Sequence, residues 1–228
     1  KAPYATLKTM NEAGVLGRYL SEFGGIVSRT QFNMHHAFTV DEHTLRLIDN
    51  YDNLAKGRLE ESIPVASRVA SGFTKNQRLT MMLACLLHDT GKGKGDQCIE
   101  GAQLAHKACN RMGIPQDITD DVAWLVRRHL DMSETAQRRD ISDPETIANF
   151  AKLIGSKRRL DLLLVLTVSD IRSVGPGIWN DWKATLLRSL YLATENYLEG
   201  REDLAPTAKA ASRKEQLLER LPEEDAEL

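Results

Sequence analysis

The sequence predicts an all-α fold, because apolar residues recur at helical spacing along the chain and no stretch alternates as a β-strand does. In addition, residues suited to helix starts and glycines suited to helix ends separate the apolar stretches. The longest apolar runs, residues 79–87 and 160–168, suit buried helices and are far too short to span a bilayer. We therefore expect one helical domain and no contact with a membrane.

The composition is that of an ordinary globular protein, with 228 residues of which 42% are hydrophobic and 27% are charged. A net charge of −2 gives no global field that would favour nucleic acid or a membrane surface as a partner. The three cysteines are odd in number and lack a CxxC spacing, which indicates reduced thiols in a cytoplasmic protein.

The pattern along the chain predicts three parts. We expect a connecting segment over residues 1–35, one domain over residues 36–200 and a linker or tail over residues 201–228. The chain opens at Lys1 on a sequence with the pattern of an element already under way. It is therefore expected to be a fragment of a larger, multidomain protein.

The first helix is expected over residues 5–13, ending at Gly14. Residues 15–34 contain three further glycines, which predict an irregular connection with a short extended piece at residues 25–28.

The next helix has a clear start signal. Thr39 and Glu42 have the spacing of a capping box, and Leu45 and Ile48 follow at helical spacing. His43 falls in the first turn, where the positive end of the helix dipole favours a neutral imidazole that can bind a metal.

Further helices are expected over residues 63–71, 77–88, 97–112, 117–130, 144–155, 158–173, 178–199 and 209–221. Asp96 is the expected N-cap of the third of these, and Gly113 ends it. Pro144 stands near the first position of the fifth. Trp179 and Trp182, at the start of the 178–199 helix, are expected in the core.

The stretch from residue 83 to residue 95 changes abruptly from apolar to polar. His88 and Asp89 lie at the change, and glycines alternating with Lys92 and Lys94 follow. An imidazole beside a carboxylate is a mixed nitrogen and oxygen pair suited to Zn²⁺, Mn²⁺ or Fe. The glycines let the backbone approach a ligand closely, and the lysines favour an anionic one.

One carboxylate stands in an otherwise apolar helix. Asp170 ends the run Leu162-Leu-Leu-Val-Leu-Thr-Val-Ser-Asp170, and an ionised carboxylate there is costly unless it is paired or bound to a metal. His43, His88 with Asp89, and Asp170, on three separate helices, would converge into an open-sided metal site completed by water.

This ordered set of residues resembles the HD superfamily of metal-dependent phosphohydrolases. Within it, the local sequences resemble the uridylyl-removing branch found in the bifunctional uridylyltransferase/uridylyl-removing enzymes of bacterial nitrogen control. The matching pieces are Phe38-Thr-Val-Asp-Glu-His-Thr44, Leu87-His-Asp-Thr-Gly-Lys-Gly93, Val122-Ala-Trp-Leu-Val126, His129-Leu-Asp-Met-Ser133, Thr135-Ala-Gln-Arg-Arg-Asp140, Leu166-Thr-Val-Ser-Asp-Ile-Arg172 and Trp179-Asn-Asp-Trp-Lys183.

The resemblance implies an all-α phosphodiesterase that hydrolyses the bond between UMP and a tyrosine of the uridylylated PII signalling protein and releases UMP. It implies a divalent metal ion (Mn, Zn, Fe or Mg) on His43, His88, Asp89 and Asp170. It also implies a nucleotidyltransferase domain and glutamine-sensing ACT domains as neighbours in the full-length chain, with no nucleic acid or membrane as partner.

Further roles follow from the same resemblance. Lys92, together with Arg127 and the metal ion, would neutralise charge on the phosphoryl oxygens. Asp89 is also a candidate general base. His129 is a candidate second-metal ligand, phosphate contact or proton donor.

One departure from the family pattern matters, at the histidine of a short motif. The family has Asp-His-Ser-x-x-Gly after the glycine-rich loop, whereas this chain has Asp96-Gln97-Cys98-Ile-Glu-Gly101. A second metal would lie near Asp96, Gln97 and His129, but an amide is a poor ligand for a transition metal. Either one ion suffices, or these groups or water substitute weakly, or the activity has been lost.

Two alternative functions remain open. One is an HD phosphohydrolase that acts on free nucleotides or (p)ppGpp, against which residues 135–140 and 179–183 argue. The other is a non-catalytic HD scaffold that relays glutamine status between flanking domains. Gln97 favours the scaffold, and the retention of all four expected metal ligands opposes it.

Overall fold

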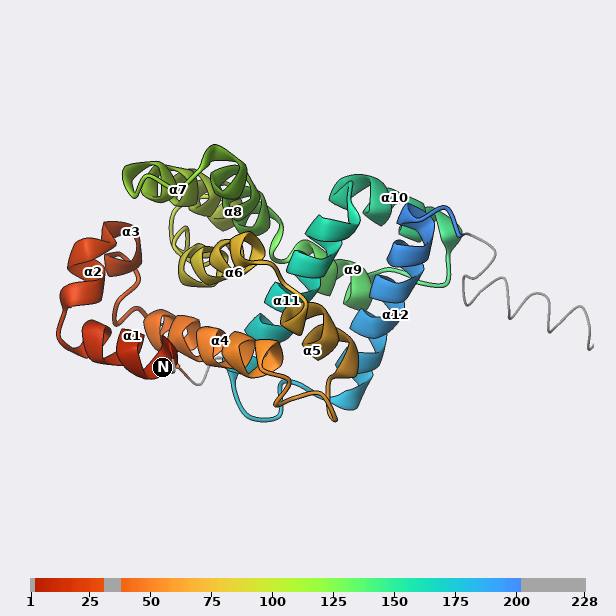
Figure 1. The fold of residues 1–228 in the computed structure, drawn as a ribbon, viewed down its shortest axis with the longest axis horizontal. Helices are drawn as coiled ribbons and strands as arrows, with labels where there is room; N and C mark the ends of the chain where they lie inside the picture. Colours follow the sequence, from red (N-terminus) through yellow and green to blue (C-terminus); the bar gives the residue numbers. More distant parts are fainter. Residues whose placement is uncertain (1–2, 31–37, 202–228) are drawn as a thin grey trace, which may run out of the picture.

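The computed structural model describes residues 3–30 and 38–201, which form α-helices joined by turns, with no β-strand among them (Figure 1). The all-α prediction is therefore confirmed. The helices are α1 Pro3–Glu12, α2 Val15–Tyr19, α3 Ser21–Gly24, α4 Val40–Ala55, α5 Pro64–Ser71, α6 Lys75–Leu87, α7 Gln97–Arg111, α8 Gln116–Arg128, α9 Asp131–Arg138, α10 Pro144–Ile154, α11 Lys157–Val174 and α12 Asp181–Leu198.

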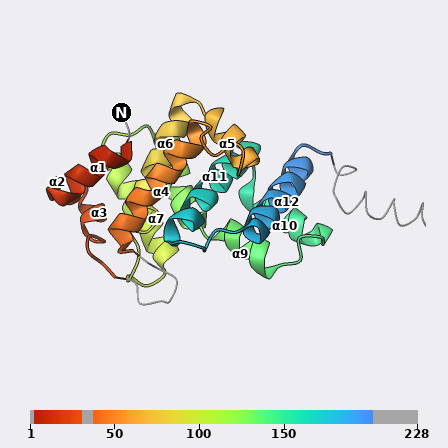
Figure 2. The same ribbon diagram turned by 90° about the horizontal axis from the view of Figure 1, so that it is seen from below.

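Helix α11 is the centre of the molecule. It packs against α4, α5, α6, α8, α9, α10 and α12, and it runs between the α4 and α6 side and the α10 and α12 side in both ribbon views (Figures 1 and 2). All residues from 162 to 169 are buried. Each buried leucine contributes roughly 1.5–3 kcal/mol through removal of apolar surface from water. Asp170 follows this buried run directly, so the core itself fixes the position of its carboxylate.

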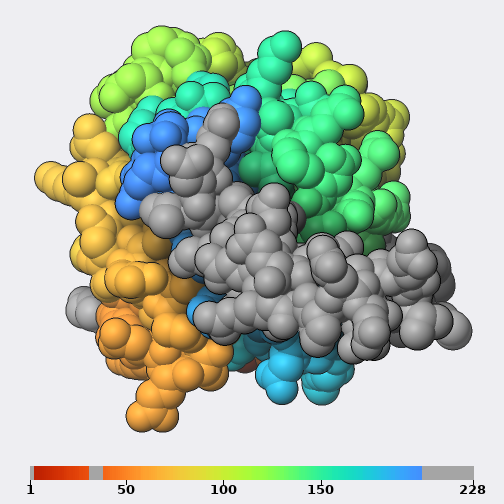
Figure 3. Space-filling view, turned by 90° about the vertical axis from the view of Figure 1, so that its right-hand side faces the viewer, coloured from red at the N-terminus to blue at the C-terminus, as the bar shows by residue number. Residues whose placement is uncertain are grey.

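The two ends of the molecule are covered by different helices. Helices α1 to α3 pack at the end where α4 begins, and α7 and α8 lie as a pair beside α6 (Figure 1). At the other end, α12 lies between the segments around α5 and those around α9 and α10 (Figure 3). Among the described residues, no helix has the length and apolar character needed to cross a lipid bilayer.

Residues 15–24 correct the sequence interpretation, because they form two short helices and not an irregular connection. A Cβ on Gly24 would lie 2.6 Å from the carbonyl oxygen of Gly17, so the two glycines let α2 and α3 touch through their backbones. Leu16 and Phe23, which precede these glycines in the chain, are buried. The expected extended piece is also absent: residues 25–28 form a turn, which ends on Ser28 with φ 58°.

The capping box lies in a different place from the one expected. Thr39 is the N-cap residue of α4, but its side chain makes no capping hydrogen bond there. The complete box occurs at α6, where the Thr74 hydroxyl accepts from the Gln77 amide and the Gln77 side chain accepts from the Thr74 amide. Asp96 and Pro144 act as expected at α7 and α10.

The structure also contains one helix that was not predicted, and one tryptophan expected in the core lies outside it. Residues 131–138 form α9, a separate helix whose buried side chains are Met132 and Ala136. Trp182 is 59% exposed, so it is not a core residue, whereas Trp179 is partly buried against the core. The helix expected over residues 209–221 lies outside the described residues.

Candidate metal centre

Three helices supply the residues of the candidate metal centre. His43 lies in the first turn of α4, His88 caps the C-terminus of α6 with Asp89 next to it, and Asp170 lies in the last turns of α11. His43, His88 and Asp89 are each at most 4% exposed, and the Asp170 side chain is 19% exposed. The convergence expected from the sequence is therefore present in the fold.

The distances between these side chains suit one shared ion. Nε2 of His43 lies 3.3 Å from Nε2 of His88 and 3.0 Å from Oδ1 of Asp170. Nε2 of His88 lies 3.9 Å from the same Asp170 oxygen. Atoms that each lie about 2.1 Å from one ion are at most about 4.2 Å apart, so all three separations fit a common metal.

The Asp89 carboxylate lies beside His43, His88 and Asp170 and also pairs with Lys92. Its Oδ2 is 3.1 Å from Nε2 of His88, 3.7 Å from Nε2 of His43 and 2.7 Å from Nζ of Lys92. Lys92 and a metal ion would therefore share one carboxylate. The other oxygen, Oδ1, faces Nε2 of His129 at 4.0 Å.

Backbone carbonyls set the orientation of two imidazole rings. Nδ1 of His88 donates to the carbonyl oxygen of Cys85 at 2.9 Å, and Nδ1 of His129 donates to that of Val126 at 2.7 Å. A carbonyl only accepts, so in the neutral rings the proton is on Nδ1 and the lone pair of Nε2 points into the site. The role of the Cys85 carbonyl was not predicted from the sequence. The sequence signal that could have indicated it is the spacing: His88 follows Cys85 by three residues, about one helical turn.

The charges of the cluster depend on one another. Burial opposes ionisation of His88, but Asp89 and Asp170 outweigh it and raise the pKa of the ring. Burial likewise opposes ionisation of Asp89, yet His88, Lys92 and His43 hold its pKa well below the usual range. Burial opposes ionisation of Asp170 too, but the hydrogen bond and charge of His43, together with the charge of His88, lower its pKa to about 2. Both carboxylates are therefore ionised near neutral pH, which suits a cation.

The glycine-rich loop is shaped by contact with α7. A Cβ on Gly91 would overlap the carbonyl oxygen of Gln97 and lie 2.5 Å from the amide nitrogen of Gly101. Gly101 in turn lies against Val126 of α8, with 3.1 Å between its would-be Cβ and a methyl group. At Gly91 the absence of a side chain therefore serves the packing of the loop on the protein itself.

Of the other predicted site residues, one lies in the cluster and three lie outside it. His129 joins the cluster: it is 2% exposed, and its ring centroid lies 5.5 Å from that of His88. Among the described residues, neither Arg127 nor Asp96 forms an ion pair with the cluster; they pair with each other at 3.7 Å. Asp96 also accepts from the amides of Cys98 and Ile99 as the cap of α7. Gln97 is the half-buried first residue of that helix.

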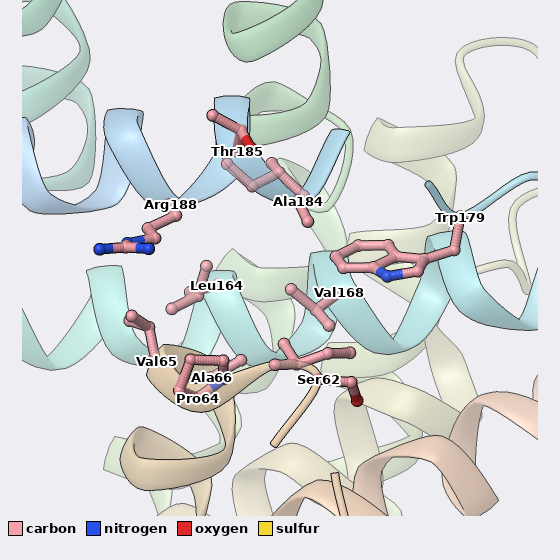
Figure 4. Close-up of a pocket in the computed structure, with 12 residues that line it drawn as sticks. Ser62, Pro64, Val65, Ala66, Leu164, Val168, Trp179, Ala184, Thr185 and Arg188 are labelled. Carbon is pink, nitrogen blue, oxygen red and sulfur yellow. The ribbon is translucent and has the colours of Figure 1, made fainter. Parts of the chain in front are cut away.

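A separate apolar pocket lies between α5, α11 and α12 and holds about 120 Å³. Trp179 stands at one end of it and Arg188 at the other, with Leu164 and Val168 of α11 between them (Figure 4). None of the residues predicted to bind metal or substrate lines this pocket. This pocket is therefore separate from the candidate metal centre.

Comparison with known proteins gives a family and close relatives. Residues 35–170 match the sequence model of the family described as HD domain. A bifunctional uridylyltransferase/uridylyl-removing enzyme of Phenylobacterium zucineum is 53% identical over 199 residues, which is 87% of this chain and 21% of that protein. Proteins of the same name from Caulobacter vibrioides and Cereibacter sphaeroides are 51% identical over 201 residues and 47% identical over 225 residues. They match 88% and 98% of this chain respectively. The chain spans about a fifth to a quarter of the length of these relatives, at 21% and 24%.

Proposed function

The chain belongs to the HD domain family, whose fold is that of an all-α metal-dependent phosphohydrolase, and from this premise we propose that it is the uridylyl-removing unit of a larger enzyme. In this proposal it hydrolyses the phosphodiester between UMP and a tyrosine of uridylylated PII protein, and it acts in nitrogen regulation. The relatives named as uridylyl-removing enzymes support this reaction, because about half of their aligned residues are identical to those of this chain over most of its length.

The observation that carries the proposal is the meeting of His43, His88 and Asp170. Their ligand atoms all lie within 4.8 Å of one another, from three helices inside or at the edge of the range that matches the HD domain. Two imidazole nitrogens with carboxylate oxygens favour Mn²⁺, Fe²⁺ or Zn²⁺ over Mg²⁺. When bound, such an ion lowers the pKa of a coordinated water and supplies hydroxide near neutral pH.

The protein's own groups would orient and balance this chemistry. Asp89 complements the trio, and the ammonium of Lys92, held on its Oδ2, brings positive charge to the place where a phosphoryl group would lie. The leaving group would be a tyrosine phenolate, whose conjugate acid has a pKa of about 10. Such a group departs without a strong general acid, so the absence of an assigned proton donor does not oppose the reaction.

His129 can be assigned a narrower role than the three expected from the sequence. Its burial and the nearby His88 lower its pKa, and its Nδ1 donates to Val126. A neutral ring with the proton on Nδ1 accepts at Nε2. This supports a role as proton acceptor or metal ligand, and it opposes roles as proton donor or phosphate contact.

We propose that a single ion is held. In place of the family histidine the chain has Gln97, whose amide is a poor ligand for a transition metal, and the Asp96 carboxylate already caps α7. Lys92 on Asp89 would supply the second positive charge.

The surroundings of the reaction are proposed from the relatives and the composition. Nucleotidyltransferase and ACT domains would flank this unit in the full-length protein, as the relatives' greater length allows. All three cysteines are free thiols, and two are buried, which supports a reducing compartment such as the cytoplasm.

The test is release of UMP from uridylylated PII by the 228-residue chain with Mn²⁺ added. The unaltered protein should release UMP, and His88→Ala should abolish release. His106→Ala is the matched control, because His106 is a half-exposed histidine paired with Asn110 and Asp120, and it should retain full activity. Absence of UMP release from the unaltered chain with bound metal would favour the scaffold function. Hydrolysis of free nucleotides alone would favour the other hydrolase.

A further inference from the structure

Arg29 connects a segment outside the matched HD range to the glycine-rich loop of the site. It follows the turn after α3, while the match to the HD domain begins at residue 35. Its Nη1 donates to the carbonyl oxygen of Lys92 at 2.7 Å. A guanidinium bonded to a backbone carbonyl is a charge-assisted contact, stronger than one between neutral groups.

The loop has a matching space for this guanidinium. Gly93 has φ +76°, and a Cβ built on it would overlap Nη2 of Arg29, with Cζ of the same side chain 2.5 Å away. Gly95, two residues further, also has a positive φ, of +42°, but nothing lies within 4 Å of its would-be Cβ. The absence of a side chain at Gly93 therefore makes room for Arg29.

The backbone of Arg29 is fastened to the helix that carries His43. Its carbonyl oxygen accepts from the amide of Val40, the first residue of α4, at 2.9 Å. The amide of Ser28 donates to Oδ1 of Asp41 at 3.2 Å, and the Asn11 side chain donates to Oδ2 of the same residue at 2.9 Å. The turn before Arg29 is thus held on the first turn of α4, which also contains His43.

We infer that Arg29 is a positioning residue, which ties the Lys92–Gly93 turn to the start of α4. Through this tie the His43 helix and the loop after His88 and Asp89 keep their relative position, and the Lys92 ammonium stays 2.7 Å from Asp89. Arg29 acts through Lys92 and does not touch the reacting atoms. The expected effect of Arg29 on turnover rests on the proposed function. The hydrogen bond from Arg29 to the Lys92 carbonyl can be tested independently of that function.

The tie is tested by hydrogen exchange of the loop amides in the 228-residue chain. The amides of Lys92 and Lys94 donate to the carbonyls of Asp89 and Gly91, so their exchange reports on the loop. Arg29→Ala should speed their exchange about tenfold or more, since local opening governs it, and Arg29→Lys should restore part of the protection. Gly93→Ala should act like Arg29→Ala. Gly95→Ala, which also places alanine at a positive φ, should have the smaller effect.

The functional consequence is tested by a double-mutant cycle on UMP release. Arg29→Ala should lower kcat about tenfold with little change in KM, and it should have no further effect in a Lys92→Ala background, because coupled residues are not additive. Equal loss in both backgrounds, or exchange unchanged by Arg29→Ala, overturns the inference. If the unaltered chain releases no UMP, the proposed function fails, while the exchange measurement still decides whether Arg29 holds the loop.

Discussion

Nε2 of His43 and Nε2 of His88 face each other at 3.3 Å in a buried site. Nδ1 of His88 already donates to Cys85, so the lone pair on Nε2 of the neutral His88 ring points at Nε2 of His43. This contact requires a proton on Nε2 of His43 or a cation between the two nitrogens. The proximity of the Asp170 carboxylate, 3.0 Å from His43, favours the cation.

Asp170→Asn should weaken metal binding at least about 100-fold, because it replaces a charged ligand oxygen with a neutral amide. The measurement is titration calorimetry with Mn²⁺ on the metal-free protein. Asp161→Asn is the control: this aspartate lies on the same helix and pairs with Lys157 and Tyr191. An unchanged affinity in Asp170→Asn would remove that residue from the proposed ligand set.

Lys92→Gln should lower kcat by roughly 10²–10³-fold, the effect typical of losing one preorganised charge at a developing oxyanion. Metal affinity should stay the same or rise, because Asp89 loses a competing partner. Lys94→Gln, a change of an exposed lysine in the same loop, should leave both quantities unaltered. A parallel loss of metal in Lys92→Gln would contradict a role confined to the substrate.

Metal affinity should rise with pH across the neutral range. The pKa of His88 is raised by Asp89 and Asp170, so below that pKa a proton occupies the nitrogen that the metal needs. Each pH unit below it should cost up to about tenfold in apparent affinity, because binding must release the proton. Calorimetry in buffers of different ionisation enthalpy would show proton release on binding, and affinity independent of pH would contradict this linkage.

Gly91→Ala should destabilise the fold by roughly 1–3 kcal/mol or more, because the added methyl group overlaps the backbone of α7. Chemical denaturation measures the change in the free energy of unfolding. Gly72→Ala is the control, since Gly72 has φ −77° and its would-be Cβ meets only ordinary contacts. A neutral result for Gly91→Ala would mean that α7 and the loop are not packed as closely as described.

The fold could be predicted in outline because long helices carry their own signals. The apolar run of α11 and the caps Asp96 and Pro144 indicated helices at the positions where they occur. The short α2, α3 and α9 were missed, since each buries only one or two side chains and leaves no period to detect. The glycines in α2 and α3 looked like breaks, yet they serve a close approach between helices.

The side chains of the candidate site could be predicted from the sequence, but the backbone contacts that orient them could not. A histidine at a helix start, a His-Asp pair at a helix end and an aspartate in an apolar helix all stand out by type and position. Contacts made through backbone atoms leave no such mark. The carbonyls of Cys85 and Lys92, which bind His88 and Arg29, belong to residues of any type, so only the fold reveals them.

The most direct test of the proposed metal centre is the metal content of the purified chain, measured by elemental analysis beside that of His88→Ala and His106→Ala. We expect about one transition-metal ion per chain in the unaltered protein and in His106→Ala, and none in His88→Ala. Two ions per chain would contradict the single-ion site. No ion in the unaltered protein after incubation with Mn²⁺, Fe²⁺ or Zn²⁺, or equal metal in His88→Ala, would contradict the metal centre itself.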